Sequence, residues 1–328
     1  MRISKPDDKI ALAVVSTIAL VVLAIYVACT FNGLPFSDSM TDASLARNIA
    51  NGNGAVASVI LPYRLMFNAE MPPPELRRPL AQPILLAALF SIFPMNDWVV
   101  IVPSIVFSLA TVPILFFLAN SLFGLRTAVT GALLYIFHYG ILVYATSGLT
   151  EPAFAFFTSF SFLLVITRKN TYSILAAGLL LGLAALTRDV GTAFLPAFVG
   201  YLFFANRRQN RGSAFLFLAG FIIIMSPHWI RNFIIFGNPI MEMKTMLLAG
   251  FSSSFPEYMI EKSLVGTSPW PYIVNNPIEY VRKFFSGLDF FYWTITKREF
   301  NPYFLALALA SLLYPQKNER AERAKLLF

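Results

Sequence analysis

The sequence has little charge and only one cysteine. Of its 328 residues, 13% are charged and 57% are hydrophobic, and the mean hydropathy is +0.66. Soluble globular domains are nearer about 45–50% apolar and about 25% charged. Such a chain has too few polar side chains to cover itself in water, so the composition predicts an integral membrane protein. With a single cysteine, Cys29, an intramolecular disulfide and a cysteine-based metal cluster are excluded.

The net charge of +8 comes from Lys and Arg residues that lie in short gaps between apolar runs. They do not form one basic face, which a nucleic-acid-binding protein would need. Basic residues between apolar runs are instead the signal that orients membrane spans. We therefore predict a membrane as the partner and no nucleic acid.

Eight apolar segments without an acidic or basic side chain predict an all-α, polytopic transmembrane bundle of about eight spans. The segments are 10–31, 98–123, 127–147, 152–167, 171–187, 190–205, 213–230 and 301–314. The first is longer than the apolar core of a signal peptide, which has about 7–15 residues. It is therefore interpreted as a retained span.

A ninth apolar run, 79–95, decides the topology. If the N-terminus is cytoplasmic and this run stays outside, the basic turns at Arg126, 168–169 and 207–211 and the stretch 317–325 all lie in the cytoplasm. If the run crosses, all four move outside, against the positive-inside rule. We therefore predict that 79–95 is an interfacial or re-entrant helix.

This topology leaves two long external segments, 32–97 and 231–300, within one predicted transmembrane domain, 1–328. The end of the sequence, 324–328, resembles the start of another apolar run. The C-terminus is therefore expected to be truncated or to lack its last helix.

Three of the acids on the predicted external side are candidate site residues. Asp38 follows the first span directly, Asp42 lies one helical turn later, and Glu151 lies between the third and fourth spans. A carboxylate at the membrane surface can accept a proton from a hydroxyl or ligate a divalent cation. The alternative is helix capping, by Ser37 or Asp38 in one helix and by Thr150 or Glu151 in the other.

Four of the arginines on the same side are candidates for binding a phosphate. Arg77 and Arg78 precede the predicted re-entrant helix, where guanidinium groups are suited to a phosphate or to anchoring among headgroups. Arg188 breaks the positive-inside pattern, which indicates anion binding or an ion pair with Asp189. Arg231 follows the seventh span in the same surface layer.

The spans themselves are nearly free of charge. A channel or pump is expected to carry polar groups through the bilayer along its pathway. Charges gathered on one face instead favour an enzyme that acts at the outer surface on a lipid-anchored anion. His138 and His228 lie far apart without metal-ligand spacing and are interpreted as structural.

Short motifs recur in a characteristic order along residues 10–240. They are Asp38, Ala46-Arg47-Asn48, Gly52-Asn53-Gly54, Arg78 to Pro83, Thr150-Glu151, residues 182–188, Trp229-Ile230-Arg231-Asn232 and Phe236-Gly237-Asn238-Pro239. This order resembles the GT-C superfamily of membrane glycosyltransferases, nearest to its branch of dolichyl-phosphate-mannose–protein mannosyltransferases and aminoarabinose transferases.

The resemblance implies that a hexosyl or pentosyl group moves, with inversion, from a polyprenyl-phosphate donor to a lipid, glycan or protein acceptor. The reaction would take place on the extracytoplasmic face of the plasma membrane. Asp38 would be the general base or a metal-linked carboxylate. Arg77, Arg78, Arg188 and Arg231 would neutralise the departing phosphate. A divalent cation at Asp38 is left open, and no other cofactor is implied.

The chain departs from the family pattern in two places. Family members usually carry a second acid where this chain has Ser39, and often an aromatic residue where Asp42 stands, which moves part of the catalytic role to Asp42. Two further functions stay open: a non-catalytic protein that binds, flips or scaffolds polyprenyl-phosphate lipids, and an ion or solute transporter that depends on Glu151 or Arg188.

Overall fold

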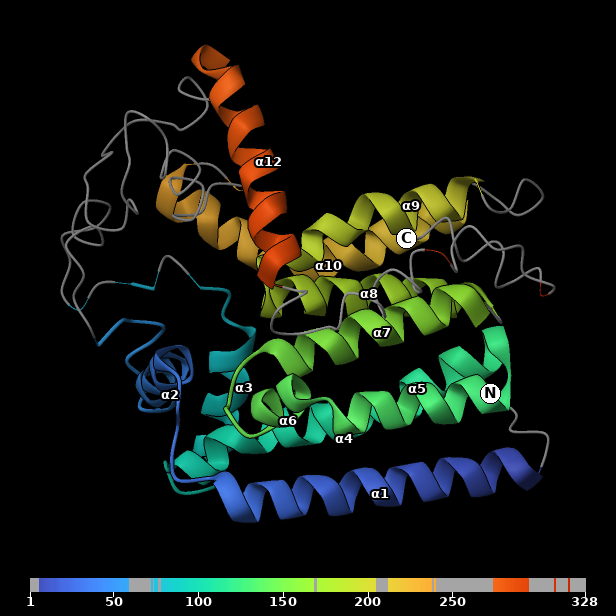
Figure 1. The fold of residues 1–328 in the computed structure, drawn as a ribbon. Helices are drawn as coiled ribbons and strands as arrows, with labels where there is room; N and C mark the ends of the chain where they lie inside the picture. The colour runs from blue at the N-terminus through green and yellow to red at the C-terminus, as the bar shows by residue number, and fades with distance from the viewer. Residues whose placement is uncertain are drawn as a thin grey trace. The chain divides into compact units, whose positions relative to one another are not determined.

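The computed structural model describes most of the N-terminal two thirds of the chain and one later helix. The described residues are 6–58, 72, 74–75, 78–167, 170–204, 212–237, 239, 274–294, 310 and 318. Within these ranges the regular structure is helical and contains no β-strand, and Val56 and Pro74 form an isolated antiparallel bridge. The predicted all-α class is confirmed (Figure 1).

The chain divides into two compact units. The first comprises Met1–Gly54, Pro79–His228 and Gln316–Phe328, and the second comprises Ala55–Arg78 and Trp229–Pro315. The prediction of a single transmembrane domain stays a prediction.

The helices follow the apolar runs closely. In chain order they are α1 (Pro6–Thr30), α2 (Ser37–Ala50), α3 (Ala81–Phe90), α4 (Asp97–Phe123), α5 (Leu125–Phe137), α6 (Tyr139–Ala145), α7 (Glu151–Thr167), α8 (Thr171–Thr187), the 3₁₀ helix η2 (Asp189–Phe194), α9 (Leu195–Phe204), α10 (Gly212–Phe236) and α12 (Pro277–Thr294). Helix α10 begins in the first unit and its last turns belong to the second.

Helices α1, α4 and α10 are long and apolar enough to cross a membrane. The segment predicted as one span at 127–147 forms two helices, α5 and α6, which are bent by 62° where His138 adopts an extended backbone. If this pair is one broken span, up to four spans pass the same test among the residues that the structure describes. Helices α7 and α8 have 17 residues each, or about 25 Å. The count of eight stays a prediction, and the expected segment 301–314 lies outside the described residues except for Ala310.

Helix α3 lies in the apolar run 79–95. Whether this run crosses the membrane determines on which side the later turns lie. Helix α3 has 10 residues, a length of about 15 Å, which is roughly half of the hydrocarbon core. A helix of this length does not cross a bilayer. The structure thus agrees with the interfacial or re-entrant interpretation of residues 79–95.

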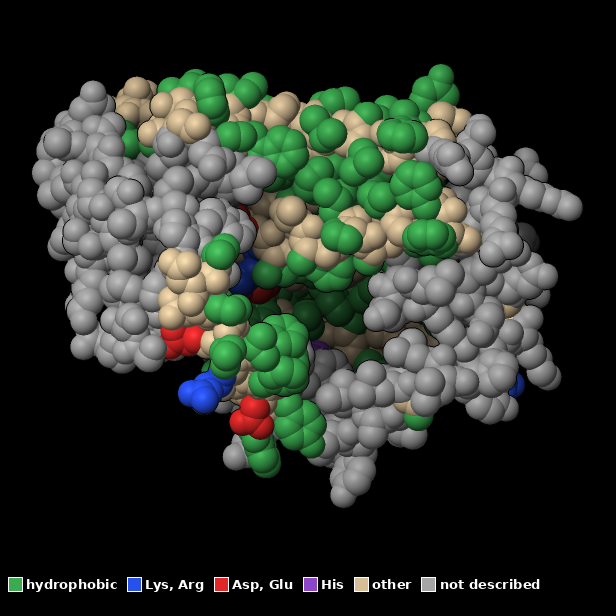
Figure 2. Space-filling view, turned by 90° about the horizontal axis from the view of Figure 1, so that it is seen from above, with side chains coloured by type: hydrophobic (Ala, Val, Ile, Leu, Met, Phe, Trp, Pro, Cys, Tyr) green, Lys and Arg blue, Asp and Glu red, His purple; other side chains and the backbone are tan. Residues whose placement is uncertain are grey.

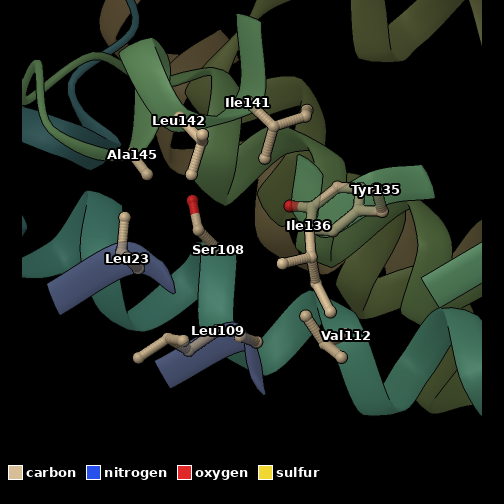
Figure 3. Close-up of a pocket in the computed structure, with 10 residues that line it drawn as sticks. Leu23, Ser108, Leu109, Val112, Tyr135, Ile136, Ile141, Leu142 and Ala145 are labelled. Atoms are coloured by element: carbon tan, nitrogen blue, oxygen red, sulfur yellow. The ribbon is translucent and has the colours of Figure 1, made fainter. Parts of the chain in front are cut away.

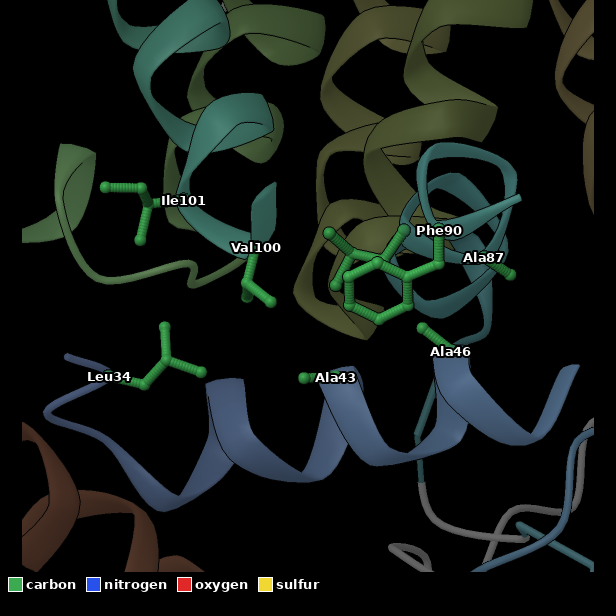
Figure 4. Packing of buried hydrophobic residues seen from close by; sticks show 8 residues of the cluster. Leu34, Ala43, Ala46, Ala87, Phe90, Val100 and Ile101 are labelled. Carbon is green, nitrogen blue, oxygen red and sulfur yellow. The ribbon is translucent and has the colours of Figure 1, made fainter. Parts of the chain in front are cut away.

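A buried cluster holds α2 and α3 against the start of α4 (Figure 4). It consists of Leu34, Ala43, Ala46, Leu86, Ala87, Phe90, Val100 and Ile101. Both residues that α2 contributes to this cluster, Ala43 and Ala46, are alanines, so its backbone lies close to α3. This packing fixes which side of α2 faces inward and which side carries its exposed residues.

Glycines allow α8 and α10 to touch backbone to backbone within the first unit. A Cβ atom at Gly178 would lie 2.0 Å from the carbonyl oxygen of Phe217, and one at Gly220 would lie 2.5 Å from that of Leu175. No side chain fits at either distance. Small residues serve this purpose in membrane helix pairs, so the contact fixes the position of α8 and of the residues at its end.

Many apolar side chains of the spans face outward. Ile10, Leu20 and Val106 are exposed in α1 and α4. On the face shown in Figure 2, most of the described side chains are hydrophobic. Contiguous apolar surface on this scale is unfavourable in water, and it is the surface that a lipid environment requires.

Candidate functional site

Helix α2 begins without a side-chain cap. Its N-cap position is Phe36, whose side chain cannot cap. The hydroxyl groups of Ser39 and Thr41 donate to the carbonyls of Phe36 and Ser37, both at 2.8 Å. Neither Ser37 nor Asp38 occupies the N-cap position, so the capping interpretation of this pair is wrong. A carboxylate in the first turn is still favoured by the helix dipole.

The two acids of α2 lie in different environments. Asp38 is exposed, whereas Asp42 is 3% exposed. The buried residues of α2 include Ser39, Asp42, Ala43 and Ala46, which recur at helical spacing and face inward. Asp38 therefore offers its carboxylate to the surroundings at the start of the helix, and Asp42 lies on the packed side one turn further on.

The loop that leads to Glu151 packs directly on the start of α2. Gly148 has a φ of +71°, and a Cβ atom there would lie 2.8 Å from Val100 Cγ1 and 3.4 Å from Ser39 Cβ. Only glycine combines this backbone conformation with such close contact. The loop is thus wedged between α2 and α4, three residues before Glu151.

Two buried polar side chains hold the same loop. Gln82 Nε2 of α3 donates to the carbonyl of Gly148 at 3.5 Å, and Ser104 Oγ of α4 donates to the carbonyl of Leu149 at 3.0 Å. Both side chains are almost fully buried. The sequence analysis did not single them out, although a polar residue inside an apolar run was the available signal.

Glu151 is the first residue of α7 and forms an ion pair with Arg188, the C-cap residue of α8. Arg188 Nη1 donates to Glu151 Oε1. The expected alternative for Arg188 was a pair with Asp189, and the observed carboxylate partner comes from a different helix. Among the described residues, Glu151 Oε2 is buried and accepts no hydrogen bond.

A tight turn sets the position of Arg188. Its backbone is extended, its N–H donates to Ala184 at 2.9 Å, and its carbonyl accepts from Gly191 at 2.8 Å. A Cβ atom at Gly191 would lie 2.7 Å from the backbone nitrogen of Ala185. The turn after α8 therefore folds back on the helix, and the guanidinium group points toward α7.

In the second unit, Arg231 links the end of α10 to Glu75. Its Nη2 donates to the carbonyl of Glu75, a fully buried residue whose N–H donates to Ala55 at 2.9 Å. A guanidinium group has five N–H donors, and this bond uses one of them. Arg78 belongs to the same unit and is partly buried. Arg77 lies outside the described residues.

The structure therefore brings together part of the predicted site. Within the first unit, the Glu151–Arg188 pair lies at the end of the helices where the loop before Glu151 meets the first turn of α2 (Figure 1). Arg78 and Arg231 belong to the other unit, so their convergence with this group stays a prediction. No group of three or more His, Cys, Asp or Glu side chains suited to a metal ion occurs in the described part of the chain.

A small cavity between α1, α4, α5 and α6 is separate from these charges (Figure 3). It is lined by Ala19, Leu23, Ser108, Leu109, Val112, Tyr135, Ile136, Ile141, Leu142 and Ala145. The lining is apolar apart from the Ser108 and Tyr135 hydroxyl groups. Because it holds neither an acid nor an arginine, the cavity is not the site of the predicted chemistry.

The chain was compared with protein families, with curated proteins and with solved structures. Residues 77–230, slightly less than half of the chain, match the family described as dolichyl-phosphate-mannose-protein mannosyltransferase. This range contains Glu151 and Arg188 and does not reach Asp38. No curated protein matches the chain.

Among solved structures, the chain is similar to the archaeal oligosaccharyltransferase AglB from Archaeoglobus fulgidus, which was solved in complex with an inhibitory peptide and a dolichol-phosphate. The TM-score is 0.54 at 14% sequence identity, and the match covers 94% of this chain and 37% of that one. The chain thus spans little more than a third of the length of AglB.

The family match and the fold confirm the resemblance to the GT-C superfamily of membrane glycosyltransferases. The matched family is described as a mannosyltransferase, which is one of the two kinds of transferase in the branch that the sequence motifs resemble. The family match supports a membrane glycosyltransferase, and the structural likeness shows the fold.

Proposed function

We propose that this protein transfers a sugar, with inversion, from a polyprenyl-phosphate donor to an acceptor on the extracytoplasmic face of the plasma membrane. The observation that carries the proposal is the packing of the Gly148 loop on the first turn of α2. It links the turn of α2 that carries the exposed Asp38 to the loop before Glu151, the partner of Arg188, and so supports a shared site. A base and a cation near each other are what a transfer from a phosphate ester requires.

Asp38 is the proposed general base. Its exposed carboxylate accepts the proton of the acceptor hydroxyl as that oxygen attacks the anomeric carbon, and the bond from this carbon to the phosphate oxygen breaks. Attack opposite to the leaving phosphate inverts the configuration. Asp42, buried one turn later, is proposed to share part of the catalytic role of Asp38.

Arg188 is proposed to stabilise the departing phosphate. Negative charge on the phosphate grows as the sugar leaves, so a fixed cation contributes more in the transition state than in the ground state. Glu151 holds one side of the guanidinium group, which limits its rotation and leaves other N–H donors for phosphate oxygens. Arg77, Arg78 and Arg231 are proposed to bind the same phosphate.

The lipid nature of the donor has support from the comparisons. The matched family is described by a dolichyl-phosphate-mannose donor, and AglB was solved with a dolichol-phosphate. The one-sided distribution of charge fits a substrate whose phosphate lies at the membrane surface. A hexosyl or pentosyl group and a lipid, glycan or protein acceptor all remain within this proposal.

The deciding experiment is turnover by the purified protein with polyprenyl-phosphate sugars, followed by mass spectrometry of released polyprenyl phosphate. Asp38→Asn is expected to lower the turnover rate by about 10²–10⁴-fold, the usual contribution of a general base. Asp97→Asn is the matched control, because Asp97 is also an exposed first-turn acid, at the start of α4.

Full turnover by Asp38→Asn, with Asp42→Asn also active, would exclude the mechanism. Binding of the lipid phosphate without turnover in any acceptor assay would instead favour a non-catalytic lipid-binding protein. Flux across proteoliposomes that depends on Glu151 or Arg188 would favour a transporter.

A further inference from the structure

Helix α12 carries an exposed apolar stripe that nothing in the proposed transfer reaction uses. The helix has 18 residues, Pro277–Thr294. Its stripe consists of Ile278, Val281, Phe284, Phe285, Leu288 and Tyr292, which recur at intervals of three or four residues and so lie on one side of the helix. All six are exposed, from 46% at Leu288 to 79% at Ile278.

The other side of α12 is mostly polar. It carries Glu279, Arg282, Lys283, Ser286 and Asp289. Phe290 is the apolar exception near the middle of this side, and Trp293 lies near the C-terminal end. The Lys283 ammonium lies 6.0 Å from the centre of the Tyr280 ring, so the aromatic ring at the edge of the stripe also contacts a cation.

Neither water nor the hydrocarbon core suits such a helix. A stripe of six large apolar side chains is unfavourable in water. The four charged residues are spread from Glu279 to Asp289, so a crossing helix would carry all of them into the bilayer, where charge is costly. Accordingly, α12 is not among the described helices that are apolar enough to cross.

We propose that α12 lies flat in the lipid–water interface, with the stripe buried among the acyl chains and the charged side in the headgroup layer. Helices of this pattern bind membrane surfaces parallel to the bilayer plane. Tyr280, Tyr292 and Trp293 supply aromatic rings near both ends, which prefer the headgroup level. The charges of α12 sum to zero, so apolar burial rather than attraction to anionic lipid holds the helix.

The same unit already contains lipid-facing surface. The last turns of α10 expose Ile230, Phe233 and Ile234, as expected where a spanning helix leaves the bilayer. Because α12 follows α10 in the chain, a spanning α10 would by itself keep α12 near the membrane surface. The proposal concerns the surroundings of α12 and does not depend on the transfer reaction.

The test is the accessibility of spin labels in the full chain, reconstituted in nanodiscs of phosphatidylcholine and phosphatidylglycerol. Cys29→Ser removes the one native cysteine, and single labels are attached at Phe285 and Leu288 on the stripe and at Lys283 and Ser286 on the opposite side. Labels at Leu20 in α1 and at Asn53 serve as references for lipid and for water, because both residues are exposed.

The stripe labels are expected to be as accessible to oxygen as the Leu20 label, and several-fold less accessible to a water-soluble nickel chelate than the labels at Lys283 and Ser286. Equal access of the chelate to all four labels would place α12 in water and overturn the proposal. Stripe labels shielded from both oxygen and chelate would show a protein contact, including one with a second copy of the chain, and would overturn it too. If a label at Phe285 prevents folding, Val281 provides the same test.

Discussion

Two helices of the first unit begin with an acid, and they use it in different ways. Asp38 in the first turn of α2 is exposed, whereas Glu151 at the start of α7 is partly buried and paired with Arg188. In the sequence both looked like caps or catalytic acids. The comparison teaches that tertiary packing, including the partner that α8 brings to Glu151, gives two similarly placed acids different environments.

The supports of the two acids differ as well. Helix α2 rests on α3 through Ala43 and Ala46, so its first turn sits on a closely packed surface. Glu151 depends on a loop that is held by Ser104 and Gln82 and bent at Gly148. Substitutions at Glu151 are therefore expected to alter the orientation of Arg188. Substitutions at Asp38 are expected to remove the proposed proton acceptor.

The largest effect after that of Asp38→Asn is expected from Arg188→Gln. Loss of one preorganised group that stabilises charge in the transition state lowers kcat by about 10²–10³-fold. Arg188→Lys is the matched variant, since it keeps the charge and loses the planar fork of donors. It should recover part of the rate when turnover is measured at saturating donor. Equal rates for Arg188→Gln and the native chain would remove Arg188 from the mechanism.

Gly148→Ala is expected to lower turnover by roughly 10–100-fold without changing either acid. The added methyl group meets Val100 at 2.8 Å, and displacement of catalytic groups by about 1 Å can cost about 10²-fold. Gly131→Ala in α5 is the control, because nothing lies within 4 Å of its Cβ position. A native rate for Gly148→Ala, measured on folded protein, would mean that the loop positions neither the first turn of α2 nor Glu151.

Glu151→Gln is expected to lower kcat/KM by about two- to fivefold only. A partly exposed ion pair contributes about 0.2–1 kcal/mol, and Arg188 and Glu151 retain side-chain exposures of 42% and 29%. The amide still accepts a hydrogen bond from Arg188. Steady-state kinetics with varied donor would measure the change. A loss as large as that of Asp38→Asn would make Glu151 a proton-transfer group and reverse the assignment of the two acids.

The smallest effect is expected from Ser104→Ala. It removes one hydrogen bond to the Glu151 loop, worth about 1 kcal/mol, so Tm should fall slightly while turnover changes by less than about twofold. Ser121→Ala is the control in the same helix, because that hydroxyl donates to Leu118 within α4. Thermal unfolding of both variants in one detergent compares them directly. An equal Tm for the two variants would show that the bond to the loop adds nothing.

The helices were predictable because their physical cause is local. Apolar runs without charge marked α1, α4, α8 and α10 to within a few residues at most ends. The run at 79–95 and the distribution of basic turns predicted an interfacial or re-entrant helix, and the helix found there, α3, has 10 residues. These features depend on composition and spacing, which a sequence shows directly.

The partners of the charged groups were not predictable in the same way. The Glu151–Arg188 pair joins residues 37 positions apart, and it forms because α7 and α8 lie side by side with α7 beginning where α8 ends. The bond from Arg231 to Glu75 spans 156 positions. The bend at His138 interrupts a run whose hydropathy reads as continuous. Each depends on tertiary packing that no local pattern encodes.

The glycine contact between α8 and α10 has a mechanical consequence. With Gly178 and Gly220 each pressed against the opposite backbone, neither helix can turn about its own axis without a collision, so the two are expected to move as one body. The direction of Arg188 at the end of α8 is then set by the pair rather than by its own side-chain freedom. Any opening that admits a lipid substrate beside Arg188 has to come from helices outside this pair.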